Sequence, residues 1–372
     1  MATPTDVLLV GFGAVGAVYS LVLKRSGLAR VTAVARGNYD AVSSRGVHFK
    51  SAKYGEIEGW RPDRLVRSVA EAADRRYSYV FVTTKAIPER VRTPQILHPL
   101  LSSPYADEHP QPTYVLLQNG LNVEVDLYNA LKKLGKGEPK IVSTALWIGT
   151  NLLEPHIVEH GNFDRLSIGM YRYNDFTTEV NSPKEAAILE DLGEMLSAGG
   201  SEITIVPEVQ RTKFAKNFWN VAFSSFSTLT QQRLPALWRP PPSDPSISYT
   251  PYVCQTTAEL ITKYTLPNIK AVMEELVVLA RAIGYPDSAS GVPSTLPDTV
   301  MENARGFHIV PESFHKPSMQ LDAEKGLPIE VEVIFGEVVR MARERGVDMP
   351  RVEMLYALLL VIQNQILAKL EA

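Results

Sequence analysis

Short apolar runs alternate with amphipathic, helix-like segments along the first half of the chain. In the segments between the runs, apolar residues recur with the period of a helix face. This alternation predicts an α/β fold with a parallel sheet. The predicted strands are "DVLLV" (6–10), "VTAVA" (31–35), "YVFVTT" (79–84), "TYVLLQ" (113–118), "IVSTALWIG" (141–149) and "EITIV" (202–206).

Beyond Pro207 the helical period continues over much longer segments. We therefore expect two domains, an α/β Rossmann-type dinucleotide-binding domain over residues 1–207 and an all-α domain over residues 208–372. The predicted helices cover residues 123–134 and 183–198 in the first domain, and 208–234, 252–265, 268–283, 329–345 and 351–370 in the second.

Two stretches depart from regular periodicity. The proline-rich stretch "LWRPPPSDPS", from Leu237 to Ser246, predicts a loop because proline ends helices. Near the C-terminus, Gln363, Asn364 and Gln365 interrupt the apolar run "LYALLLVIQNQIL". This interruption predicts a buried terminal helix rather than a membrane anchor.

The composition narrows the range of partners. The chain has 372 residues, 45% of them hydrophobic and 21% charged, with a formal net charge of -3. This near-neutral balance argues against nucleic-acid or membrane-surface binding and favours a small-molecule partner. Cys254 is the only cysteine, which excludes an internal disulfide and any multi-cysteine metal site. With no basic, apolar leader at the N-terminus, we expect a cytoplasmic protein.

Three glycines, Gly11, Gly13 and Gly16, follow the first predicted strand and open a predicted helix. In the dinucleotide-binding fingerprint the first glycine makes the tight turn, the second lets the backbone approach the pyrophosphate, and the third lets helix and strand pack closely. Glycines also bound many strands for purely structural reasons. In its strand-turn-helix context, the stretch predicts cofactor binding by Gly11, Phe12, Gly13, Ala14, Val15 and Gly16.

Arg36 follows the second predicted strand, where no Asp or Glu is present to bind a ribose 2′-hydroxyl. An arginine at this place suits a 2′-phosphate, so we expect NADPH rather than NADH. The alternative is an exposed arginine that merely ends a strand.

Polar residues also follow the third and fourth predicted strands. Lys85 stands at the end of "VTTKA", and Asn119 and Gly120 follow "LLQ". Each fits ordinary turn chemistry, but together, above a glycine-rich turn, they predict a site at the carboxyl edge of the sheet. We therefore expect Lys85 and Asn119 to contact the cofactor.

An ordered set of motifs gives the chain its resemblance to the ketopantoate reductase (2-dehydropantoate 2-reductase) family. The set consists of "GFGAVG", "VTTKA", "QNG", "DRLSIG", "KNFWNVAFSSFSTLT" from Lys216, and "PSMQLDAEKGLPIEVEVIFG" from Pro317. The resemblance covers nearly the whole chain. It implies NADPH-dependent reduction of 2-dehydropantoate to pantoate, a step of pantothenate biosynthesis, in a cleft between the two domains.

The resemblance also assigns roles to residues of the second half. Lys216 matches the family's catalytic lysine. Glu330 matches a glutamate with a catalytic and cofactor-binding role, which would position Lys216 or the cofactor ribose near the nicotinamide. Asn220, Ser224 and Ser318, together with Asn119, match substrate-binding positions. Ser224 stands where the family has an asparagine, and a hydroxyl cannot offer a carbonyl and an NH₂ together. This departure places ketopantoate itself in doubt more than the reaction class.

Helix geometry agrees with these roles, because residues spaced four apart project from one face. Lys216 would stabilise the charge that develops on the keto oxygen and donate the proton. Lys213, which is followed four residues later by Asn217, competes for the catalytic role. Only the register of Lys216 aligns the following residues with the family's helix.

Other polar residues are weaker candidates. His156 and His160 lack a third ligand, so we expect no metal site. We expect His308 and His315 to be surface residues and Cys254 to be a small core residue. Two alternatives to ketopantoate reduction stay open: a reductase of the same fold acting on another ketone or imine, and a protein that senses NADPH without turnover. We expect no nucleic-acid or membrane partner, and a homodimer is possible.

Overall fold

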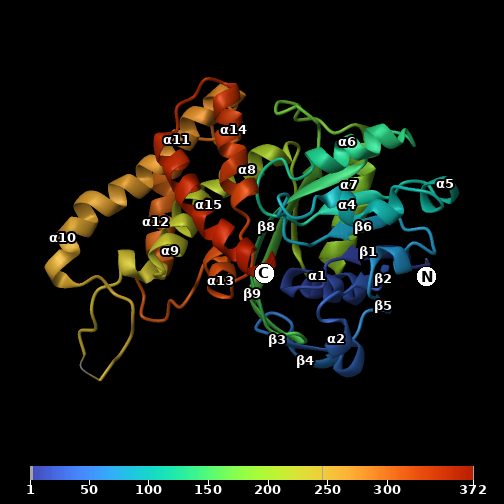
Figure 1. Ribbon diagram of the computed structural model, residues 1–372, viewed down its shortest axis with the longest axis horizontal. Helices are drawn as coiled ribbons and strands as arrows, with labels where there is room; N and C mark the ends of the chain where they lie inside the picture. Colours follow the sequence, from blue (N-terminus) through green and yellow to red (C-terminus); the bar gives the residue numbers. More distant parts are fainter. Residues whose placement is uncertain (1–2, 245, 372) are drawn as a thin grey trace. The chain divides into compact units, whose positions relative to one another are not determined.

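The computed structural model describes residues 3–244 and 246–371 and divides into two compact units (Figure 1). The first unit is Met1–Lys213 and the second is Phe214–Ala372. The division lies inside helix α8 (Val209–Trp219), a few residues beyond the boundary predicted at residue 207.

A mixed sheet of ten strands forms the centre of the first unit. Its order is β4-β3-β9-β8-β7-β6-β1-β2-β5, with β10 paired to β9. The strands from β8 to β5 run parallel, as predicted, whereas β8–β9 and β3–β4 are antiparallel pairs. The strands are β1 (Thr5–Val10), β2 (Ala29–Val34), β3 (Val47–Ser51), β4 (Gly55–Trp60), β5 (Arg64–Val66), β6 (Tyr79–Val82), β7 (Thr113–Leu116), β8 (Ile141–Glu154), β9 (Ile157–Met170) and β10 (Glu202–Ile205).

Helices cover this sheet. Helix α1 (Ala14–Arg25) packs against β2, β8 and β9 and against α7 (Pro183–Ala198). Helix α7 begins at a capping box in which Ser182 and Glu185 bond each other's backbone N–H groups, as the sequence "SPKE" favours. The remaining helical elements of the unit are α2 (Tyr39–Arg45), α3 (Val69–Ala72), α4 (Thr93–Ile96), η1 (His98–Leu100), α5 (Tyr105–Glu108) and α6 (Val125–Leu134).

The second unit is helical within the part of the chain that the structure describes, as predicted. Its longest buried face belongs to α11 (Leu266–Ile283), where Met273, Leu276 and Leu279 have no exposed surface. Helix α11 packs against α12, α14 and α15. The unit's other elements are η2 (Asn220–Ser224), α9 (Ser225–Thr230), η3 (Leu234–Leu237), η4 (Gln255–Thr257), α10 (Ala258–Leu260), η5 (Ile261–Thr265), α12 (Leu296–His308), α13 (Ser318–Glu324), η6 (Glu332–Gly336), α14 (Glu337–Glu344) and α15 (Pro350–Glu371).

Two residues of this unit lie where the sequence did not predict them. Cys254 is exposed rather than in the core, because the predicted helix begins only after it, at Gln255. His308 is buried at the end of α12, where its ring nitrogen Nδ1 lies 2.9 Å from the hydroxyl of Ser313. The hydrogen bond with Ser313, in the loop after α12, stabilises His308 in the interior. The sequence had predicted that His308 lies at the surface.

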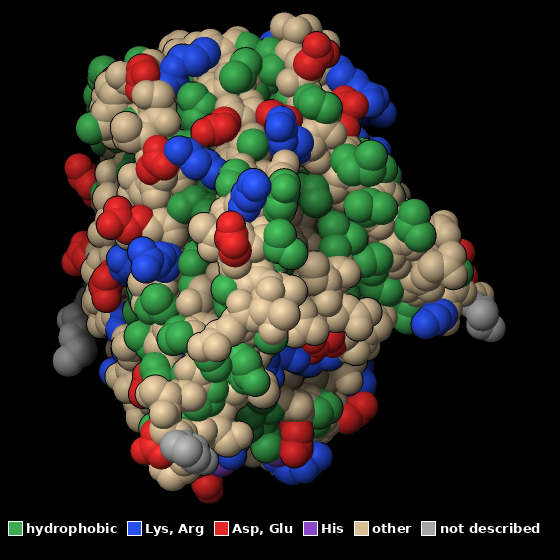
Figure 2. All heavy atoms as spheres, turned by 90° about the vertical axis from the view of Figure 1, so that its left-hand side faces the viewer, with side chains coloured by type: hydrophobic (Ala, Val, Ile, Leu, Met, Phe, Trp, Pro, Cys, Tyr) green, Lys and Arg blue, Asp and Glu red, His purple; other side chains and the backbone are tan. Residues whose placement is uncertain are grey.

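The terminal helix α15 is more exposed than predicted. By length and composition alone it would be able to cross a membrane, and 22% of its apolar window is buried. One such helix is weak evidence for a membrane span. Met354, Leu358 and Val361 recur on one exposed face of it. Figure 2, which views the side of the helical unit, shows hydrophobic side chains in several groups among the polar surface.

Candidate active site

The glycine turn between β1 and α1 has the geometry that the fingerprint predicts. Gly11 has a φ of +104°, and a Cβ there would lie 2.8 Å from the backbone nitrogen of Thr84. A Cβ at Gly16 would lie 2.0 Å from the carbonyl oxygen of Gly11. A Cβ at Gly13 would meet nothing within 4 Å. Gly11 and Gly16 are therefore required by packing, whereas Gly13 borders open space.

That open space lies at the N-terminus of α1, whose N-cap is Gly13. No side chain caps this end, and the first turn holds no acidic residue. Free N–H groups of a helix N-terminus bind phosphate well. The residues present therefore fit a dinucleotide pyrophosphate. Of the other predicted cofactor contacts in the turn, Phe12 is buried, whereas Ala14 and Val15 are half-buried.

Arg36 lies just beyond β2 and is exposed. Within residues 3–244 and 246–371, its guanidinium forms no ion pair and no hydrogen bond. The nearby Arg67, in contrast, pairs with Asp40 at 2.6 Å and lies over the ring of Tyr39. Arg36 is thus the arginine of this edge that is available to a phosphate group.

Lys85 and Asn119 follow two hydrogen-bonded parallel strands, β6 and β7, at the same edge of the sheet. The amide of Gln118 joins the two strand ends by donating to the carbonyl of Thr84 at 2.9 Å. The hydroxyl of Thr83 donates to the carbonyl of Gly11 at 2.5 Å. The predicted cofactor residues of the first unit therefore lie on segments that are directly bonded to one another.

Lys213 forms a buried polar cluster with two residues that the sequence did not single out. Its ammonium lies 2.5 Å from a carboxylate oxygen of Glu124 and donates to the hydroxyl of Ser143 at 3.2 Å. The hydroxyl of Ser143 also donates to Glu124. All three side chains are buried. Of the two competing lysines, Lys213 is thus held inside the first unit.

Glu208, at the start of α8, is a second titratable group that the sequence did not single out. Its carboxylate accepts the backbone N–H groups of Gln210 at 2.9 Å and Arg211 at 2.5 Å. Burial raises the pKa of Glu208 to about 7, against the lowering effect of these hydrogen bonds. The helix that bears both lysines therefore begins at a carboxyl group that titrates near neutral pH.

The helix that carries the predicted site residues is not regular. Asn220–Ser224 is π-helical and joins α8 to α9. The hydroxyl of Ser225 donates to the carbonyl of Val221 at 2.6 Å, which satisfies a backbone group within this segment. Segments of π-helix inside α-helices occur frequently at functional sites. The predicted face of Lys216, Asn220 and Ser224 thus includes a local distortion.

Asn217, the partner in the competing lysine register, is a structural residue. Its side chain is buried and donates to the carbonyl of Ile334 at 2.9 Å. Ile334 lies in η6, a second π-helical segment. Asn217 therefore links helix α8 to the π-helical segment η6 within the second unit.

Three further observations concern the remaining predicted residues. Ser318 begins α13 and is exposed, while Glu330 lies just before η6 and is buried. Both α13 and η6 pack against η2, the segment of Asn220 and Ser224. In the described part of the chain, the side chains of Asn220, Ser224 and Ser318 form no hydrogen bond. The second unit thus brings three polar side chains without partners to adjoining elements.

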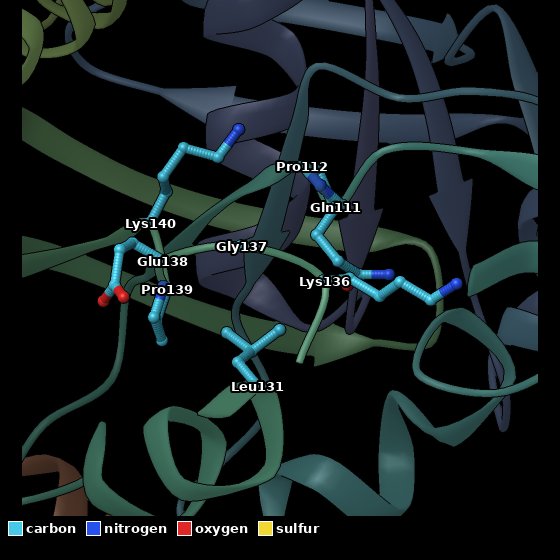
Figure 3. A pocket seen from close by; sticks show the side chains of 8 residues that line it. All are labelled: Gln111, Pro112, Leu131, Lys136, Gly137, Glu138, Pro139 and Lys140. Carbon is cyan, nitrogen blue, oxygen red and sulfur yellow. The ribbon is translucent and has the colours of Figure 1, made fainter. Parts of the chain in front are cut away.

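A small hollow elsewhere on the first unit is not part of this site. It is lined by Gln111, Pro112, Leu131, Lys136, Gly137, Glu138, Pro139 and Lys140 (Figure 3). It lies at the amino ends of β7 and β8, opposite the edge at which α/β sheets bind ligands. The ammonium of Lys136 is bound by Asp107 at 3.1 Å. Gln111 is likewise bonded to neighbouring residues, the carbonyl of Leu100 and the hydroxyl of Tyr114.

Comparison with known families gives two matches. The model described as "Ketopantoate reductase PanE/ApbA" matches residues 7–173. The model described as "Ketopantoate reductase PanE/ApbA C terminal" matches residues 247–363. Among curated proteins, the chain is similar to "Uncharacterized protein YDL144C" of Saccharomyces cerevisiae. The identity is 26% over 373 residues, covering 97% of this chain and 94% of that protein.

Solved structures share the fold along nearly the whole chain. A 2-dehydropantoate 2-reductase from Methylococcus capsulatus has a TM-score of 0.72 at 23% identity, with 97% of each chain covered. A D-mandelate dehydrogenase, in a ternary structure with NADH and anilino(oxo)acetate, has a TM-score of 0.72 at 17% identity. That match covers 97% of this chain and 99% of the dehydrogenase. At these identities the solved structures establish the fold.

Proposed function

The chain belongs to the ketopantoate reductase family, whose members are NADP-dependent oxidoreductases, and on this premise we propose that it reduces a 2-keto acid to the 2-hydroxy acid with NADPH. Ketopantoate is the first candidate substrate and pantoate its product. One observation supports this proposal most directly: within the described residues, the side chains of Asn220, Ser224 and Ser318 form no hydrogen bond. The first two lie on η2, which continues the helix of Lys216, and Ser318 lies on α13, which packs against η2.

In the proposed reaction NADPH supplies the hydride to the keto carbon. Lys216 stabilises the negative charge that grows on the keto oxygen and then donates a proton to that oxygen. Asn220, Ser224 and Ser318 hold the substrate through hydrogen bonds. Glu330, buried just before η6, positions Lys216 or the cofactor ribose. The burial of Lys213 in an ion pair with Glu124 supports a structural role for that lysine.

We further propose that Arg36 binds the 2′-phosphate of NADPH and that the glycine turn binds the pyrophosphate. The exposed, unpaired guanidinium of Arg36 supports the first assignment, and the open space at Gly13 supports the second. Lys85 and Asn119 complete the cofactor site at the ends of β6 and β7. Because the similar D-mandelate dehydrogenase is described with NADH, affinity for both cofactors is the measurement that tests this assignment.

A substrate panel tests the reaction. NADPH consumption is followed at 340 nm, a wavelength set by the cofactor, with ketopantoate, other 2-keto acids, keto amides and imines. Turnover of 2-keto acids alone supports the proposal. Turnover of only an imine or another ketone assigns a different substrate to the same fold. Tight NADPH binding without turnover of any member assigns the sensing role.

We also propose a homodimer in the cytoplasm. The near-neutral charge of the chain and its ordinary composition support a small-molecule enzyme of that compartment. Light scattering on the purified chain measures its mass, and a monomer at micromolar concentration contradicts the dimer. Fractionation of cells separates cytoplasmic from membrane-bound protein.

A further inference from the structure

Five aromatic rings of the second unit form a closed circuit, which we call the aromatic circuit. It consists of Trp219, Phe223, Trp238, His308 and His315. Successive ring centroids lie 5.9 Å apart for Trp219–Phe223, 5.7 Å for Phe223–Trp238 and 6.3 Å for Trp238–His308. The circuit closes through His308–His315 at 5.9 Å and His315–Trp219 at 5.9 Å. These distances are within the range of attractive aromatic pairs.

The proline-rich segment contributes Trp238 to this circuit and is held in place by the next residue, Arg239. The guanidinium of Arg239 is fully buried and donates to the carbonyl of Pro251 at 2.6 and 2.9 Å. It also donates to the carbonyls of Pro311 at 2.8 Å and Ser313 at 3.3 Å. Ser313 in turn bonds His308. The segment is therefore anchored against the loop that precedes α13.

The aromatic circuit takes rings from the same chain segments as the proposed substrate-binding residues. Trp219 is one helical turn from Lys216 and adjacent to Asn220, and Phe223 precedes Ser224. His315 stands three residues before Ser318. Each of the two segments that carry proposed substrate contacts thus also contributes a ring, and the contact of Trp219 with His315 joins them.

The rings are also partly accessible. Phe223 and His308 are buried, Trp219 and Trp238 are half-buried, and His315 is exposed. Burial, together with the neighbouring His315, lowers the pKa of His308 to about 4, so that its ring is neutral at neutral pH. The circuit therefore offers a wall of aromatic rings in which the buried His308 carries no charge at neutral pH.

We infer that this wall receives the side chain of the substrate and that the preferred substrates are 2-keto acids whose side chain is an aromatic ring. Ring faces and edges bind another ring by stacked or edge-on contact. The branched, aliphatic side chain of ketopantoate has no ring and offers no such contact. The inference rests on the proposed function. The balanced step is hydride transfer from NADPH to the keto carbon and proton transfer to its oxygen, giving an aryl 2-hydroxy acid and NADP⁺.

The experiment compares phenylglyoxylate, ketopantoate and 2-ketoisovalerate with the purified full chain and NADPH. We expect kcat/KM for phenylglyoxylate to exceed that for ketopantoate by roughly tenfold or more. Trp219→Ala should lose about tenfold more kcat/KM on phenylglyoxylate than on 2-ketoisovalerate, chiefly through KM. Trp219→Phe should keep most of the preference, because it keeps a ring.

Trp60→Ala is the matched control, because Trp60 lies on β4 of the first unit and makes an edge contact with Phe49. This variant should leave the ratio of kcat/KM for phenylglyoxylate to kcat/KM for 2-ketoisovalerate unchanged. Circular dichroism verifies the folding of each variant. A preference for ketopantoate, with equal losses on both acids in Trp219→Ala, overturns the inference and leaves the proposed function standing. No turnover of any of the three acids, despite NADPH binding, overturns both.

Discussion

The ammonium of Lys213 and the carboxylate of Glu124 form a buried ion pair across 89 positions of the chain, at 2.5 Å. Ser143 bonds both partners. Removing one member of such a pair leaves the other charge buried without compensation. This ion pair therefore distinguishes Lys213 from Lys216, although helix geometry alone places both lysines on one face.

The first prediction contrasts these lysines. Lys213→Ala should lower the free energy of unfolding by about 3–5 kcal/mol, with kcat per folded molecule largely kept. Lys216→Ala should lower kcat by roughly 10²–10⁴, with stability close to that of the parent chain. Denaturant unfolding and steady-state kinetics on both variants measure the contrast. Loss of kcat in stable, folded Lys213→Ala would reverse the assignment of the two lysines.

A paired substitution serves as the control for this prediction. Lys213→Met combined with Glu124→Gln removes both charges, so it should recover much of the stability that Lys213→Ala loses. If the double variant is no more stable than the single one, the ion pair does not explain the loss.

The second prediction concerns the glycine turn. Gly13→Val should fold normally, since a Cβ there meets nothing within 4 Å, but should lose NADPH binding because the side chain enters the proposed pyrophosphate space. Gly16→Ala should instead lower the melting temperature, because its Cβ would lie 2.0 Å from the carbonyl oxygen of Gly11. Fluorescence titration and thermal melts distinguish the two effects. Unchanged NADPH affinity in folded Gly13→Val would leave the turn a purely structural role.

The third prediction concerns Arg36. Arg36→Ala should weaken NADPH binding by about 1.5–3 kcal/mol, roughly 10- to 150-fold in Kd, while NADH binding changes little. Arg67→Ala is the control, because Arg67 is already paired with Asp40. Calorimetric titration with both cofactors provides the numbers. Equal affinity of the parent chain for NADH and NADPH would contradict the role of Arg36.

The fourth prediction uses Glu208, whose pKa burial raises to about 7 from an ordinary value of 4.5. The native state favours the protonated form, so the contribution of this group is full below about pH 4.5 and is lost as the pH rises through 7. The contribution of Glu208 to the free energy of unfolding therefore changes by about 3 kcal/mol between these two pH values. Denaturant unfolding between about pH 4 and 8, a range bracketing these values, should show a smaller pH dependence in Glu208→Gln. Identical profiles would show that Glu208 titrates normally.

The fifth prediction concerns Ser224, whose buried side chain forms no hydrogen bond within the described residues. Ser224→Asn adds the amide that the resemblance to the family implies for this position. It should raise kcat/KM for ketopantoate relative to phenylglyoxylate, at a packing cost of about 1–3 kcal/mol in stability. Kinetics on the two acids test the direction. An unchanged ratio in the folded variant would make the departure neutral.

The α/β fold, the helical second half and the residues of the glycine turn were predictable because their signals are local. Strand β9 was not recognised as a full strand, since His160 and Asp164 interrupt its apolar pattern. Both are buried because residues 51–54 supply their partners: the hydroxyl of Ser51 lies 2.9 Å from His160 and that of Tyr54 lies 2.6 Å from Asp164. No local pattern reports partners that lie so far along the chain.

The same limit applied to the candidate site. Helical spacing placed Lys213 and Lys216 on one face, but the burial of Lys213 depends on Glu124 and Ser143 in other elements. The aromatic circuit likewise joins residues distant in sequence, such as Trp219 and His315. The residue types were visible in the sequence, whereas their neighbours became visible only in the fold.

Among the residues that the structure describes, the hydrogen bonds of Arg239 go only to main-chain oxygen atoms, those of Pro251, Pro311 and Ser313, while its guanidinium lies over the ring of Tyr249. Every amino acid offers the same carbonyl, so substitutions in either bonded segment leave the acceptors of the guanidinium in place. Mutation is therefore free to exchange side chains around the anchor while the path of the backbone persists. A single arginine in this way gives natural selection a fixed frame on which neighbouring positions acquire new chemistry without first having to refold the loop.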